Sequence, residues 1–143
     1  MAGKSQPIVW RLSLTVPREQ VYELLSTDEG RARFWAESTR RRGDAIVFRC
    51  ADDSTHRAWV IEEKPPLRFS LAYQGGIATF RLIKSGKGTR LELAHAGVAA
   101  ADRAVAEAAW VGILLGLKAA AQFDVDLRNH DRRRSLRQRF VDQ

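Results

Sequence analysis

The feature that most constrains this fold is a long apolar helical segment near the C-terminus. Glu107 and Lys118 interrupt the segment between residues 104 and 121, which leaves it short of the roughly 18 uninterrupted apolar residues of a membrane span. We interpret it as a buried helix that begins after Asp102. A helix apolar on two neighbouring stripes must be covered on more than one side, by a curved sheet or by a second copy of the chain. The first stripe holds Trp110, Ile113, Leu114, Leu117, Ala121 and Val125, and the second holds Val111 and Leu115.

The preceding sequence supplies candidate strands for such a sheet. Residues 8–16 alternate between apolar and polar side chains, which predicts a half-buried strand. Pro17 then favours the first turn of a short helix through Leu25. Thr27 is the expected cap of a second short helix that ends near Trp35.

Five short apolar-alternating runs follow between about residues 37 and 98, and turn residues separate them. This spacing predicts an antiparallel meander with glycine turns at 74–76 and 85–88. A possible extra strand near residues 38–42 would contain no apolar residue. The order of strand, two short helices, antiparallel strands and long helix predicts the α+β class, with a curved antiparallel sheet wrapped around the C-terminal helix.

The length of 143 residues is that of one domain, with a core at about 8–127 and an arginine-rich tail at about 128–143. Cys50 is the only cysteine, so no internal disulfide can form. The polar N-terminal residues lack the apolar core of a secretory signal. We therefore expect a single soluble cytoplasmic domain.

The net charge of +7 belongs mostly to the tail, where six arginines against two aspartates leave +4 within residues 127–143. The tail and the run Arg40 to Arg42 can attract phosphate of nucleic acid, an anionic lipid surface or an acidic partner. Nucleic acid ranks last, because no row of exposed aromatic residues is available to stack bases. A solvated surface with a loose or helical tail is the simpler interpretation, although Leu136 and Phe140 leave room for a short docking helix.

Several local motifs resemble the heat-shock ATPase activator homologue branch of the START-like (SRPBCC) superfamily. They are Val16-Pro17, the helix Val21 to Thr27, the pair Phe34-Trp35, and Ala109 to Lys118 at the long helix, where Ala109 departs from the usual glycine. The resemblance covers roughly residues 8 to 125. It implies the helix-grip fold and a cavity between sheet and helix, on a scaffold shared by lipid carriers, cyclase-like enzymes, hormone binders and chaperone activators. Fold alone does not assign function, so no catalytic residue is carried over.

In that fold, one set of side chains should face the gap between sheet and helix. Tyr73 and His95 are the candidate polar anchors, and Trp35 is a candidate for the cavity mouth. The alternative is a fully packed core in which these side chains are simply satisfied. The complete candidate set is Trp35, Phe69, Leu71, Tyr73, Leu91, Leu93, His95, Trp110, Ile113, Leu114 and Leu117.

The sequence offers little material for catalysis or metal binding. Cys50 has no recognisable basic partner, and the three histidines lack the spacing of a zinc motif. The turn at residues 85–89 lacks the upstream glycine of a phosphate loop. We assign no catalytic residue, metal or cofactor and expect a domain that binds a small hydrophobic ligand. The alternative is a protein-interaction module of the chaperone-activator type that acts through its basic surface or tail, and the helix stripes suggest a homodimer.

Overall fold

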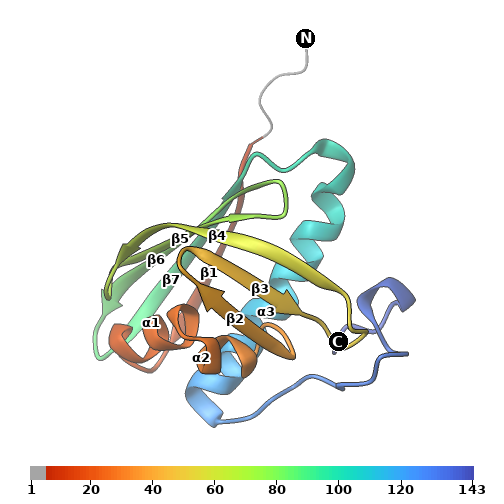
Figure 1. The fold of residues 1–143 in the computed structure, drawn as a ribbon. Helices are drawn as coiled ribbons and strands as arrows, with labels where there is room; N and C mark the ends of the chain where they lie inside the picture. The colour runs from red at the N-terminus through yellow and green to blue at the C-terminus, as the bar shows by residue number, and fades with distance from the viewer. Residues whose placement is uncertain (1–5) are drawn as a thin grey trace.

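A seven-stranded antiparallel sheet curls around the long C-terminal helix in the computed structural model, which describes residues 6–143 (Figure 1). The strand order is β1-β7-β6-β5-β4-β3-β2, and every neighbouring pair is antiparallel. The predicted α+β helix-grip class is therefore confirmed. The strands are β1 (Ile8–Leu14), β2 (Ser38–Arg42), β3 (Ala45–Arg49), β4 (Thr55–Lys64), β5 (Arg68–Tyr73), β6 (Gly76–Ser85) and β7 (Gly88–Ala96).

Two short helices close one end of the curved sheet, and the long helix crosses its inner face (Figure 1). Thr27 caps the second of them as predicted, because its side-chain oxygen accepts from the Gly30 amide at 3.0 Å. Asp102 occupies the N-cap position of the long helix, but its side chain makes no capping hydrogen bond. The helical elements are α1 (Arg18–Ser26), α2 (Asp28–Ala32), η1 (Ala100–Asp102), α3 (Arg103–Phe123) and η2 (Leu136–Gln138).

The core lies between the inner face of the sheet and one stripe of α3. The stripe contributes Trp110, Leu114 and Leu117, which are all buried. Alternation along β5 and β7 brings Phe69, Leu71, Tyr73, Leu91, Leu93 and His95 to the same interior. By length and composition alone, residues 100–123 would also qualify as a membrane span. In this fold, the segment serves as the core helix.

An arginine in the interior fastens α2 to β2. Arg31 is fully buried, and its guanidinium donates to the Leu25 carbonyl at 3.0 Å and to the Thr39 hydroxyl at 3.2 Å. It also forms an ion pair with Asp28. The extra strand near residues 38–42 is present as β2, and its inner positions meet the polar side chains of α2 rather than the apolar core.

The C-terminal segment, residues 124–143, returns from the end of α3 towards the turn between β3 and β4 (Figure 1). Arg128 donates to the Ala32 carbonyl at 2.6 Å and to the Ala36 carbonyl at 2.7 Å. Arg132 lies 3.8 Å from a carboxylate oxygen of Asp53. The segment is extended apart from short turns and the single turn of 3-10 helix at η2, so the tail is docked where a loose or helical one was expected.

Candidate functional site

A cluster of aromatic rings fills the space between α3 and the inner face of the sheet. Trp35, which follows α2, lies at its centre. Its ring centroid is 5.0 Å from that of Phe48, 5.6 Å from Tyr73, 5.7 Å from Phe80 and 5.9 Å from Trp110. These tilted and edge-on contacts are the favoured geometries of aromatic pairs. The cluster joins α2, the sheet and α3 into one packed unit.

Histidine 95 links the helix to the sheet within this cluster. The Trp110 indole donates to His95 Nδ1 at 2.9 Å, and His95 Nε2 lies 2.9 Å from the Tyr73 carbonyl oxygen. An indole N–H can only donate, so Nδ1 must be unprotonated and Nε2–H must donate to the carbonyl. His95 is therefore neutral here, in agreement with a pKa that burial lowers.

The phenol of Tyr73 is the second polar group of the cluster. Its hydroxyl accepts from the Trp35 indole at 3.3 Å. Burial raises the pKa of Tyr73 to about 12, so the phenol is neutral at physiological pH. The polar groups at the centre of the cluster are thus uncharged donors and acceptors, which suit a neutral or weakly polar molecule.

His56 is a member of the cluster that the sequence analysis missed. Its ring stacks on Phe48 with centroids 5.0 Å apart and an interplanar angle of 3°, and it meets Tyr73 edge-on at 5.5 Å. Its Nε2 is buried and has no hydrogen-bond partner within residues 6–143, and burial lowers the pKa of the imidazole. The available signal was the alternation along β4, which brings His56 to the inner face of the sheet. There it lies directly opposite Phe48 in the β3–β4 register.

Nucleophilic and metal chemistry find little support among the described residues. Burial raises the pKa of the Cys50 thiol, which disfavours the reactive thiolate. Within residues 6–143, no group of three His, Cys, Asp or Glu side chains is placed to hold a metal ion.

The predicted site residues fall into two groups. Trp35, Tyr73, His95 and Trp110 come together in the aromatic cluster. The others lie in the apolar core around it. Ile113 is half-buried, and the remaining six are buried: Phe69, Leu71, Leu91, Leu93, Leu114 and Leu117.

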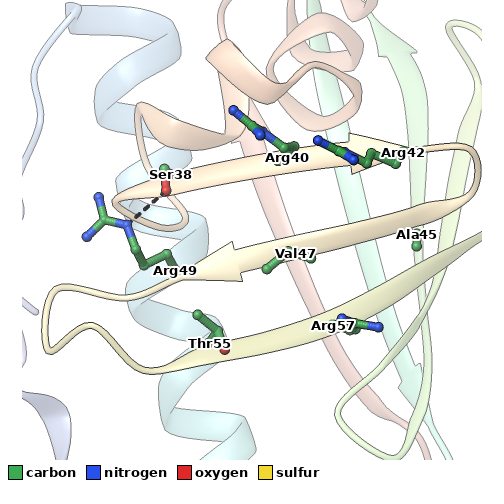
Figure 2. Close-up of a pocket in the computed structure, with 8 residues that line it drawn as sticks. All are labelled: Ser38, Arg40, Arg42, Ala45, Val47, Arg49, Thr55 and Arg57. Carbon is green, nitrogen blue, oxygen red and sulfur yellow. Dashed lines mark hydrogen bonds between the residues drawn. The ribbon is translucent and has the colours of Figure 1, made fainter.

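Two hollows lie on the surface of the protein, away from the aromatic cluster. One is on the outer face of β2, β3 and β4 (Figure 2). The other lies between α1, α2 and the end of α3, and it is lined by Arg33 and by the carboxylates of Glu23, Glu29 and Asp124. In the latter, Arg33 is already paired with Asp124 at 2.8 Å.

Comparisons with known proteins match this chain to one family and one fold. The family model "Activator of Hsp90 ATPase homolog 1-like protein" matches residues 15–122. No curated protein sequence matches the chain. Among solved structures, protein SSP2350 from Staphylococcus saprophyticus is similar at a TM-score of 0.75 and 21% identity, over 85% of this chain and 96% of that one.

Two further structures show the same fold. The Aha1 dimer from Colwellia psychrerythraea has a TM-score of 0.75 at 20% identity, covering 83% of this chain and 98% of that one. CalU16 from Micromonospora echinospora has a TM-score of 0.68 at 21% identity, covering 82% of this chain and 77% of that one. Since the family model spans most of the sheet and α3, this chain belongs to the Activator of Hsp90 ATPase homolog 1-like family of the START-like (SRPBCC) superfamily.

Proposed function

We propose that this domain binds a small, largely apolar molecule at the aromatic cluster between the sheet and α3. The observation that carries the proposal is the Nε2 atom of His56, which is buried beside aromatic rings and finds no hydrogen-bond partner in the described part of the chain. Such an atom costs about 1–3 kcal/mol, which a ligand with one hydrogen-bonding group would recover. Apolar, aromatic walls with a few polar groups are typical of small-molecule sites.

The ligand would have to part the rings that now touch one another. Trp35 is the ring best placed to move, because it lies in the connection between α2 and β2 rather than inside a strand or α3. The C-terminal segment adjoins this connection through the hydrogen bond from Arg128 to Ala36. A planar aromatic molecule fits this site best, since it can replace ring-on-ring contacts with equivalent ones.

A ligand screen tests this proposal. The full chain is titrated with fatty acids, aromatic polyketides and isoprenoids and followed by thermal shift and tryptophan fluorescence. We expect planar aromatic members to raise the melting temperature and to quench fluorescence. Tyr73→Phe keeps the ring but removes the hydroxyl, and it should weaken binding about fivefold to tenfold, the value of one hydrogen bond.

The matched control is Trp59→Phe, which changes an exposed ring on the outer face of the sheet. It should leave the affinity for the same ligand unchanged. Native mass spectrometry of protein purified from its own host gives an independent result. A bare mass, together with no stabilisation by any member of the panel, would rule the proposal out.

The second candidate function is a protein-interaction module that acts through a basic surface or the tail. Several arginines of the tail already have partners: Arg128 binds two backbone carbonyls and Asp126, Arg132 meets Asp53, and Arg134 meets Asp131. The arginines on the outer face of β2 and β4 are better placed to reach a partner, because they remain exposed and unpaired within residues 6–143.

We also propose that the protein forms a homodimer through the second stripe of α3. Val111 and Leu115, four residues apart on α3, are both exposed. An exposed apolar stripe on a helix is costly in water and is typical of an interface. One protein of the same fold, from Colwellia psychrerythraea, is described as a dimer.

A further inference from the structure

The outer face of the sheet carries a hollow of about 520 Å³ at the β2–β3–β4 end (Figure 2). Its floor consists of the small side chains Ala45 and Val47, both on β3. Figure 2 shows Arg40 and Arg42 extending from β2 on one side, and Arg57 on β4 on the other side. Ser38, Arg49 and Thr55 line the remaining end.

Strand register places these arginines around the floor. Val47 pairs with Arg40 on one side and with Arg57 on the other, so their Cα atoms are two strand spacings, about 10 Å, apart. Alternation along β2 brings Arg40 and Arg42 to the outer face and turns Arg41 inwards, where it pairs with Glu63. Of the three consecutive arginines, two therefore line the hollow and the third forms an ion pair with Glu63.

The arginines of this hollow differ from the others on the same face. Arg11, Arg81 and Arg90 all lie 3.4 to 3.6 Å from a carboxylate oxygen of Glu92. Arg68 lies 3.5 Å from Glu62.

In contrast, Arg40, Arg42 and Arg57 form no ion pair or side-chain hydrogen bond within the described residues 6–143. Arg49 at the end of the hollow is bound to Ser38 and Asp53. The hollow is therefore surrounded by three positive charges without a carboxylate to neutralise them.

Beside this charged rim lies an exposed indole. Trp59 is 50% exposed, and it faces Ala45 directly in the β3–β4 register. It also follows Arg57 by two residues on β4, so both side chains project from the same face. An aromatic or heterocyclic ring can stack on such an indole.

We propose that this hollow binds a nucleoside polyphosphate, with the phosphates at Arg40, Arg42 and Arg57 and the base against Trp59. Guanidinium groups bind phosphate through paired, charge-assisted hydrogen bonds. The long arginine side chains stand around a floor of small side chains, which favours a compact anion that all three guanidinium groups can reach. This site lies on the opposite face of the sheet from the aromatic cluster, so it stands independently of the ligand proposed there.

Calorimetric titration of the full chain with ATP and with inorganic triphosphate tests the proposal. We expect both to bind, ATP more tightly, with affinities that fall as salt rises. The double variant Arg40→Gln/Arg57→Gln should weaken both by about a hundredfold, since each removed arginine takes away a charge-assisted hydrogen bond worth about tenfold. Trp59→Leu should lower the affinity for ATP to that for triphosphate and leave triphosphate binding unchanged.

The matched control is Arg81→Gln/Arg90→Gln, which removes the same charge from the same face at arginines that are ion-paired. This control should retain the affinity of the unmodified chain for ATP. Equal losses in both double variants would overturn the site, because general surface charge would then explain binding. The proposal also fails if neither ATP nor triphosphate binds. Binding of only a single-stranded oligonucleotide, or of only phosphatidylglycerol vesicles, would overturn it in the same way.

Discussion

Arg31 is the side chain on which the junction between α2 and β2 depends. Its guanidinium is fully buried, and burial lowers its pKa, although the adjacent Asp28 carboxylate opposes this shift. Replacing it with alanine removes the donor to the Leu25 carbonyl, the Thr39 hydroxyl and Asp28. Since three acceptors each lose a hydrogen bond worth about 1 kcal/mol, we expect Arg31→Ala to destabilise the fold by about 3 kcal/mol in urea unfolding.

The control for this prediction is Arg33→Ala, two residues along the chain. Arg33 is exposed and pairs with Asp124, so its loss should cost less than about 1 kcal/mol. Similar unfolding midpoints for the two variants would contradict the structural role assigned to Arg31.

The sequence did not distinguish these two arginines. Both lie at the C-terminal end of α2, where a positive charge is favourable. Arg31 is buried because Thr39 of β2 and Asp28 of its own helix bind its guanidinium. The local sequence gives no sign of these partners. Thr27, whose capping contact is local, was predicted correctly.

Elements that face the core were predicted well, and elements with other partners were not. The alternation of β5 and β7 and the stripe Trp110, Leu114 and Leu117 reappear as buried faces. β2 has no apolar residue, because its inner side meets polar groups of α2 through Thr39 and Arg41. Hydrophobic periodicity indicates which residues contact a core, and it gives no signal for an edge strand whose partners are polar.

The second stripe of α3 leads to a prediction about association. The sheet covers the first stripe at Trp110, Leu114 and Leu117, but Leu115 stays 50% exposed, so the remaining cover would come from another copy. Sedimentation velocity should show a dimer for the unmodified chain and a monomer for Leu115→Glu, because a buried interfacial carboxylate is strongly unfavourable.

Ile61→Glu serves as the control for charge, since Ile61 is similarly exposed at 54% but lies on the sheet. This variant should remain dimeric. A monomer for the unmodified chain, or dissociation of both variants, would remove α3 as the interface.

At the scale of the whole molecule, the C-terminal segment connects parts of the fold that are distant in sequence. It joins the end of α3 to the connection between α2 and β2 through Arg128, and to the β3–β4 turn through Arg132. The arginine-rich composition of this segment was visible in the sequence. Its docking was not, because Arg128 binds the backbone carbonyls of Ala32 and Ala36, which any residue type could offer.

His130 makes the docking of this segment dependent on pH. Its Nδ1 lies 2.5 Å from a Glu37 carboxylate oxygen and its Nε2 lies 2.8 Å from one of Asp126, so both nitrogens donate and the ring is an imidazolium. The hydrogen bond to Glu37, with that to Asp126, raises the pKa of His130 above 6.5 despite partial burial. Burial raises the pKa of Asp126, but hydrogen bonds from Arg128 and its charge outweigh this and lower it to about 2.

The signs of these shifts define a pH window for docking. A raised histidine pKa stabilises the docked segment fully below 6.5, and this contribution disappears as pH rises through the higher folded value. The lowered pKa of Asp126 contributes above 3.8 and is lost as pH falls through about 2. Amide hydrogen exchange at residues 128–135, corrected for intrinsic rates, should therefore accelerate on the alkaline side. His130→Gln should abolish this acceleration while the protection of β5 and β7 stays unchanged, whereas a pH-independent exchange in the unmodified chain would show that His130 does not hold the segment.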